Sequence, residues 1–157
     1  MRRAILLIED NPDHILLIQA ALESLPRARP LMVMNDGAQA LEYIRWLSAA
    51  PLPELPCLIL LDLKLPKVDG LDILRALRAS PAWRQVPVIV LTTSNHPADI
   101  RTSLAQGANA YLSKMSALNG AMTELIRAVE TSLPDIPRPG GLAAEARYTH
   151  DESRRPQ

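Results

Sequence analysis

Cys57-Leu58-Ile59-Leu60-Leu61-Asp62 is the strongest buried-strand pattern in this chain of 157 residues. A short, continuous apolar run is typical of a parallel strand that is covered on both faces. Similar runs occur at residues 4–8, 31–34, 87–91 and 110–112. Apolar residues at helical spacing lie after each of them. The strict alternation predicts an α/β fold, a doubly wound parallel sheet of five strands with helices on both faces.

The expected helices carry residues 12–25, 38–47, 73–77, 97–107 and 118–133. Asn11 is the expected N-cap of the first helix, because Pro12 suits the first helical position. From residue 134 the pattern fails, and Pro, Gly and charged residues follow. We therefore expect one domain at residues 1–133 and a mobile tail at residues 134–157.

Composition excludes several classes of protein. The chain has 17 Lys and Arg against 17 Asp and Glu, and only 3% aromatic residues, so binding to nucleic acid is not expected. No apolar run approaches the ~20 residues of a membrane span, so no membrane association is expected either. Cys57 is the only cysteine, which rules out an internal disulfide and favours a cytoplasmic location.

Polar residues follow four of the predicted strands. Glu9 and Asp10 come after the first strand, Asp62 after the third, Thr92 after the fourth and Lys114 after the fifth. Because ligands bind beyond the carboxyl ends of the strands in such sheets, these side chains are expected to share one site. Three clustered carboxylates repel one another, and Mg²⁺ would remove that conflict.

These parts fit phosphoryl transfer to a carboxylate nucleophile. Each residue alone has a plainer interpretation, since an acid after a strand is more often a helix cap or a turn former. Only their joint occurrence at separate strand ends favours a common site.

The chain resembles the receiver domain of two-component response regulators from about residue 5 to residue 133. The matching motifs are Glu9-Asp10, residues 60–70, residues 91–94 and residues 107–114. The resemblance implies the flavodoxin-like receiver fold and a signalling relay in which a histidine kinase is the partner. It implies a protein that is not an enzyme beyond its own phosphoryl transfer and dephosphorylation.

The resemblance also implies roles for particular residues. Asp62 would accept the phosphoryl group, and Mg²⁺ would be bound by Glu9, Asp10, Asp62 and the backbone carbonyl of Lys64. Thr92 would be the switch hydroxyl and Lys114 the lysine that pairs with the phosphoryl group. Tyr111 would be the switch aromatic, with a half-exposed tyrosine on an edge strand as the alternative.

Two positions depart from the family pattern or refine it. Met115 stands where the family usually has a proline in a cis peptide, so a trans bond and another loop path are expected. Thr93 is bulkier than the Ala or Gly often found there, which is expected to slow loss of the phosphoryl group.

The residue pattern at 91–94 and the Pro-rich insert before Cys57 resemble those of single-domain regulators paired with bacterial phytochrome histidine kinases.

Two other functions compete with this interpretation. A phosphohydrolase of the haloacid-dehalogenase type also uses an aspartate at a strand end, but it needs an acid where this chain has Lys64. An unphosphorylated scaffold is the second alternative, and the complete set of site residues argues against it.

A homodimer is expected through the face made by the fourth helix, the fifth strand and the last helix. The fifth strand is expected at the sheet edge, with Tyr111 and Leu112 on it. The last helix has more apolar residues than one core stripe needs, and Ala121 and Ala128 would allow close approach.

Overall fold

A computed structural model describes the chain except for residues 1, 52, 119–121, 134–146 and 149–157. The strands are β1 Ile5–Ile8, β2 Leu31–Met34, β3 Leu58–Leu61, β4 Val88–Thr92, β5 Ala110–Ser113 and β6 Arg147–Tyr148. The helices are α1 Pro12–Glu23, α2 Gly37–Ser48, α3 Gly70–Ala79, α4 Pro97–Ala105, α5 Lys114–Ala117 and α6 Thr123–Ser132.

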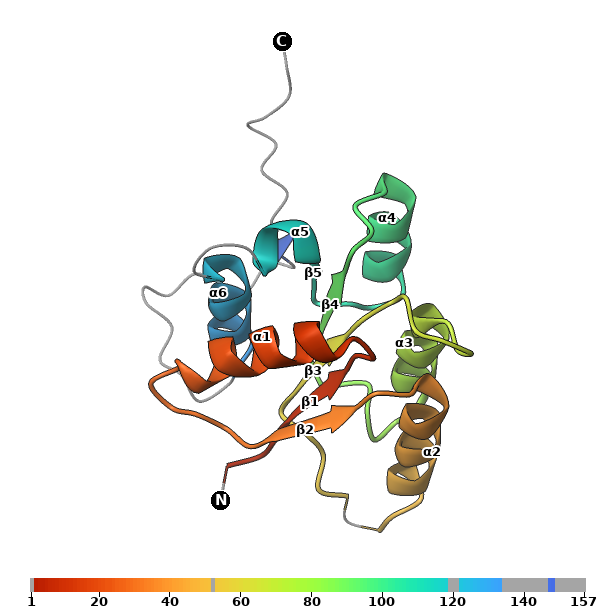
Figure 1. The fold of residues 1–157 in the computed structure, drawn as a ribbon. Helices are drawn as coiled ribbons and strands as arrows, with labels where there is room; N and C mark the ends of the chain where they lie inside the picture. The colour runs from red at the N-terminus through yellow and green to blue at the C-terminus, as the bar shows by residue number, and fades with distance from the viewer. Residues whose placement is uncertain (1, 52, 119–121, 134–146, 149–157) are drawn as a thin grey trace.

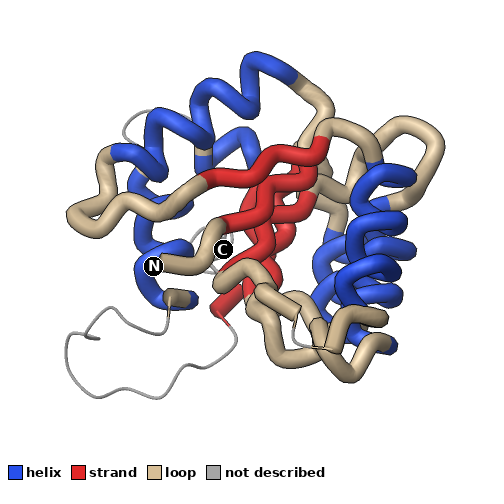
Figure 2. The backbone as a smooth tube through the Cα atoms, turned by 90° about the horizontal axis from the view of Figure 1, so that it is seen from below, coloured by secondary structure: helices blue, strands red, loops and turns tan. Residues whose placement is uncertain are grey.

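The strands form one parallel sheet in the order β2-β1-β3-β4-β5-β6. The five predicted parallel strands are confirmed, and two-residue β6 is added beside β5. Helices α1, α5 and α6 cover one face of the sheet, and α2, α3 and α4 cover the other (Figures 1 and 2). Because both faces are covered, every residue of β1, β3 and β4 is buried, which explains their unbroken apolar runs.

The first helix begins as the sequence predicts. The Asn11 side chain accepts hydrogen bonds from the backbone N–H groups of Asp13 and His14, and Pro12 occupies the first turn. These bonds satisfy N–H groups that have no partner within the helix. The cap therefore sets the direction in which α1 leaves the edge of the sheet beside Glu9.

The predicted last helix is wrong in its extent. A helix of one turn, α5, starts directly at Lys114, and α6 begins only at Thr123. Met122 precedes α6 in the left-handed conformation, with φ of 53°, which breaks a continuous helix. Leu118 and Met122 still pack on the core, from the connection between the two helices.

The prediction that β5 is the edge strand is also wrong. Ala110 and Tyr111 pair with Arg147 and Tyr148 of β6, so β2 and β6 are the edges. Leu112 is 1% exposed and belongs to the core. Apart from β6, the predicted tail at residues 134–157 lies outside the described residues, and so does Ala121.

Within the described part of the chain, no helix has the length and apolar character needed to cross a bilayer. The peptide bond between Lys114 and Met115 is trans, which confirms the prediction. Ser113 caps α5 by accepting a hydrogen bond from the Met115 N–H, so the chain turns into a helix where the family usually has proline.

Gly70 holds the loop between β3 and α3 against the end of β3. Its N–H donates to the carbonyl of Leu63 at 3.0 Å. A Cβ at this position would lie 2.5 Å from both the Asp62 carbonyl oxygen and the Leu63 Cα. These are backbone atoms, so no side-chain rotation can relieve the contact.

We predict that Gly70→Ala lowers the free energy of unfolding by about 2–3 kcal/mol, because the added methyl must displace backbone atoms. Asp69→Ala is the matched control, since it removes only the cap of α3 and should cost about 1 kcal/mol. Urea unfolding measures both values. An equal loss in the two variants would contradict the argument from close approach.

Candidate functional site

The register of the strands brings the predicted polar residues to one edge of the sheet. Ile8, the last residue of β1, pairs with Leu61, the last residue of β3. The next residues, Glu9 and Asp62, therefore lie side by side just beyond the two strands. Thr92, the last residue of β4, pairs with Ser113, the last residue of β5. Lys114 is the first residue after β5. Glu9, Asp62, Thr92 and Lys114 are all buried, whereas Asp10 is exposed. The strand register thus places these residues at the same edge of the sheet, and their shared function stays a prediction.

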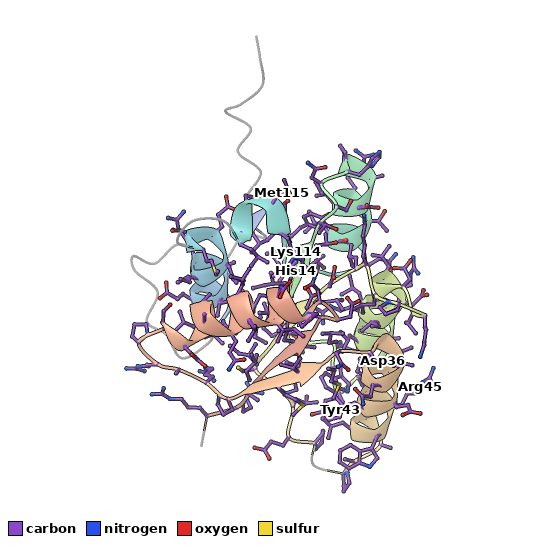
Figure 3. All side chains as sticks on the ribbon, viewed as in Figure 1. His14, Asp36, Tyr43, Arg45, Lys114 and Met115 are labelled. Carbon is purple, nitrogen blue, oxygen red and sulfur yellow. The ribbon has the colours of Figure 1, made fainter. Side chains whose placement is uncertain are left out.

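Lys114 lies at the centre of the site. Its Nζ is 2.5 Å from Glu9 Oε2 and 2.9 Å from Asp62 Oδ2. The same Nζ lies 3.0 Å from His14 Nδ1, on the first turn of α1. In Figure 3, His14 and Lys114 lie next to each other where α1 begins, with Met115 close by on α5. The three ammonium hydrogens of Lys114 thus have three acceptors.

Backbone amides hold the other carboxylate oxygens. The N–H of Asn11 donates to Glu9 Oε1 at 3.0 Å, and the N–H of Lys64 donates to Asp62 Oδ1 at 3.1 Å. In each case the donor lies two positions after the acceptor in the sequence. The hydrogen bond therefore fixes the carboxylate against the loop that follows its strand. Both carboxylates are thereby oriented by the local chain before any ligand is considered.

Burial raises the pKa of the Glu9 carboxyl above its ordinary value, and the negative charge of Asp62 raises it further. The hydrogen bond from Lys114 acts in the opposite direction and compensates only in part. Glu9, Asp10 and Asp62 offer three carboxyl groups beside the single Lys114 ammonium, and this count favours binding of a further cation.

The acidic residues have the geometry of a divalent cation site. Glu9, Asp10 and Asp62 each offer a carboxylate oxygen, and these oxygens lie within 4.8 Å of one another. Hard oxygen donors of this kind suit Mg²⁺ and similar ions. The donor set therefore fits the predicted metal. Participation of the Lys64 carbonyl stays a prediction, because only its N–H has a described contact here.

Thr92 at the end of β4 and Tyr111 on β5 are the predicted switch residues. Thr92 is fully buried, and its Oγ1 has no hydrogen-bond partner among the described residues. Tyr111 is buried rather than half-exposed, and its hydroxyl donates to the carbonyl oxygen of Ser94. The Ser94 hydroxyl in turn donates to Asp99 at the start of α4. The loop after β4 is thus tied both to β5 and to α4.

Sequence reasoning missed two contributors to this region. His14 could have been found from its place one turn after the N-cap Asn11, at the same edge of the sheet as Asp10. Ser94 was seen only as part of a motif. Its bond to Asp99 is local, whereas the bond that it accepts from Tyr111 depends on how β5 packs beside the loop, which no local pattern encodes.

Comparison with known proteins identifies relatives. The profile of the response regulator receiver domain matches residues 5–129. The chain is 43% identical over 110 residues to the "Probable methanogenesis regulatory protein FilR2" of Methanothrix harundinacea, with 70% of each chain covered. It is 32% identical over 129 residues to the response regulator Rcp1 of Synechocystis, covering 82% of this chain and 87% of Rcp1.

A solved structure shares the whole fold. The phosphorylated cyanobacterial phytochrome response regulator RcpA superposes with a TM-score of 0.74 at 31% identity, over 90% of this chain and 100% of RcpA. The Mn²⁺-bound form of Rcp1 gives the same TM-score at 30% identity, over 88% of this chain and 99% of that one.

The raised pKa of Glu9 gives a prediction on stability without divalent cations. The folded protein holds the Glu9 proton to higher pH than the unfolded chain does. The stabilisation from this proton is complete below pH 4.5, the ordinary pKa, and is lost as pH rises through the folded pKa. Glu9→Gln should therefore stabilise the protein more at pH 8 than at pH 5.

Thermal unfolding in a chelator measures this difference, with Glu23→Gln on the exposed face of α1 as the matched control. The increase in thermal stability caused by Glu9→Gln should grow with pH, and it should grow more than any change seen in the control variant. A gain that shrinks as pH rises would show that the buried carboxylate is stabilised in its charged form.

Proposed function

Because the chain belongs to the response regulator receiver family, we propose that Asp62 accepts a phosphoryl group from the phosphohistidine of a histidine kinase in a Mg²⁺-dependent reaction. The observation that carries the proposal is the burial of Asp62 at the end of β3, with the Lys114 ammonium at 2.9 Å and two further carboxylates beside it. The site combines a nucleophile, a fixed positive charge and a cation site.

In the proposed reaction, one carboxylate oxygen of Asp62 attacks the phosphorus atom. The new O–P bond forms as the P–N bond of phosphohistidine breaks, and the departing imidazole nitrogen keeps the electron pair and takes up a proton from solvent. Lys114 would pair with a phosphoryl oxygen and stabilise the charge that is transferred. The backbone N–H of Lys64 holds Asp62 in orientation through its Oδ1.

Magnesium is the proposed metal, and Glu9, Asp10 and Asp62 would hold it. When bound, it would neutralise the carboxylates and the phosphoryl oxygens that approach them. Mn²⁺ is bound in a structure of the related Rcp1, which supports a divalent cation of this size. The carbonyl of Lys64 remains the proposed further ligand.

Phosphorylation is proposed to act on the rest of the molecule through Thr92. Its buried Oγ1 has no partner among the described residues, so a hydrogen bond to a phosphoryl oxygen would satisfy it. The inward position of Tyr111 and its bond to Ser94 couple this region to α4. A shift of Thr92 would therefore move the loop after β4.

The competing phosphohydrolase function receives no support from the site. The second residue after Asp62 is Lys64, whose exposed side chain cannot serve as the acid that such enzymes place there. We propose that the protein catalyses only its own phosphorylation and dephosphorylation. The set of contacts around Lys114 likewise argues against an unphosphorylated scaffold.

We propose a bacterial phytochrome kinase as the partner and the cytoplasm as the location, on the similarity to RcpA and Rcp1. Exposed apolar side chains lie on the elements that border the site. Leu16 and Leu17 on α1 are 65% and 40% exposed, and Met115 on α5 is 68% exposed. A partner that presents phosphohistidine to Asp62 would cover such residues.

Asp62→Asn is predicted to abolish phosphorylation, because it removes the nucleophile. The chain should gain one phosphoryl group from acetyl phosphate and Mg²⁺, measured by intact-protein mass spectrometry. Asp10→Asn should retain the reaction but raise the Mg²⁺ concentration it needs by about tenfold, because a ligand charge is lost.

Asp13→Asn is the control, since it removes an exposed carboxylate on the first turn of α1 that is not among the proposed ligands. Undiminished labelling of Asp62→Asn would place the phosphorylation site elsewhere. Labelling that needs no divalent cation would contradict the proposed metal.

A homodimer through α4, β5 and α6 remains part of the proposal, but its apolar rationale is weakened. Leu112 is buried, and none of the large apolar side chains exposed in the described structure lies on these three elements. Contact through this face would therefore be mostly polar, around residues such as Arg101 and Arg127, which are exposed on α4 and α6.

Sedimentation velocity at micromolar concentration tests the dimer. We expect a dimer, and Arg101→Glu or Arg127→Glu should weaken it about tenfold if those charges face the partner copy. Arg75→Glu on α3 is the control on another face. A monomer with and without phosphorylation would contradict the dimer.

A further inference from the structure

Of the contacts that the Lys114 ammonium makes with described residues, the one with His14 has no part in the proposed reaction. We propose that His14 is a positioning residue, which keeps the Lys114 ammonium paired when a divalent cation takes over Glu9 and Asp62. This inference rests on the proposed function, since it concerns the exchange of one cation for another in the same site. It assigns to α1 a part in setting the affinity for the metal.

The contact between His14 and Lys114 defines which ring nitrogen carries the proton. An ammonium group can only donate hydrogen bonds, so His14 Nδ1, at 3.0 Å from Nζ, must be the acceptor. The ring proton then lies on Nε2. His14 thus acts here as a neutral acceptor, equivalent to a third oxygen around the ammonium.

The ammonium contacts two of the three residues that would hold a divalent cation. Lys114 Nζ contacts Glu9 and Asp62, and both residues belong to the acidic group that would hold the metal. Entry of a metal ion must therefore loosen Lys114 from at least one carboxylate. Its side chain is only 4% exposed, so water offers little replacement.

A buried charged donor without an acceptor is costly, so the displaced ammonium needs another partner. Of the three described contacts of Nζ, only His14 is outside the acidic group. The ring is 26% exposed and lies at the rim of the site. It would remain available to the ammonium while the carboxylates turn to the metal.

The position of His14 is well defined for this role. Its backbone N–H donates to the side chain of the N-cap Asn11 at 3.3 Å, and Pro12 restricts the first turn of α1. Helix α1 is in turn packed on the sheet by Ile18 and Leu22. The imidazole is therefore carried by an anchored element and not by a loose loop.

The role of His14 predicts a difference between the metal-free and metal-bound states. Without metal, loss of the imidazole leaves Lys114 with two carboxylates, which is a small change. With metal bound and at least one carboxylate turned away from Lys114, the same loss removes a second of its three described acceptors. His14→Leu should therefore weaken metal binding about 10- to 100-fold, the range expected for one hydrogen bond to a charged group.

Titration of the full chain with Mn²⁺, followed by the electron paramagnetic resonance signal of the free ion, measures binding without any reaction. His14→Asn places an amide oxygen near the position of Nδ1 and should bind Mn²⁺ within about twofold of the unsubstituted chain. Gln19→Leu, an exposed polar-to-apolar change on the same helix, is the matched control and should have no effect.

A double-mutant cycle with Lys114→Met separates this role from direct metal binding by His14. If His14 acts through Lys114, His14→Leu should have no effect on Mn²⁺ affinity once Lys114 is replaced. An effect that persists in full in the Lys114→Met background would overturn the inference. Unchanged affinity of His14→Leu, or an equal loss in His14→Asn, would also overturn it.

The same titration distinguishes failure of the inference from failure of the proposed function. If the unsubstituted chain binds no Mn²⁺, the proposed metal site is wrong and the role of His14 falls with it. If the chain binds Mn²⁺ and Asp10→Asn weakens the binding, the metal site stands. An unaltered His14→Leu variant then rejects only the role of the imidazole.

Discussion

Lys114 places one buried ammonium between the buried carboxylates of Glu9 and Asp62, and the arrangement of the site depends on this contact. Two carboxylates removed from water repel each other and are poorly solvated, so neither could stay charged without a nearby cation. Burial raises the pKa of the Glu9 carboxyl, and the hydrogen bond from Lys114 offsets that rise only in part.

This contact constrains the sheet that supports it. Glu9, Asp62 and Lys114 come from the ends of three strands, so β1, β3 and β5 must end at the same level. The parallel register achieves this, and helices on both faces hold it because they bury nearly all side chains of the central strands. Gly70 lets the chain leave β3 without pushing the backbone of Asp62 out of line.

The loops around the site are connected to different parts of the molecule. Asn11 and His14 belong to the start of α1, whereas Ser94 and Asp99 link the loop after β4 to α4. The proposed change in charge at Asp62 would therefore have separate routes to the start of α1 and to α4. His14 contacts the Lys114 ammonium beside Asp62, and Tyr111 donates to the carbonyl of Ser94 in the loop after β4.

The sequence by itself determined the alternating elements, the parallel sheet and the meeting of Glu9, Asp62, Thr92 and Lys114, because strand-end residues of a parallel sheet share one edge. It did not determine the break before α6, the pairing of β6 with β5, or the burial of Leu112. These features depend on how distant segments pack. The same local apolar pattern occurs in a buried core and at an interface, so the pattern cannot distinguish them. The contact of His14 with Lys114, 100 residues apart, arose only from tertiary packing, because it requires α1 and α5 to meet above the sheet edge.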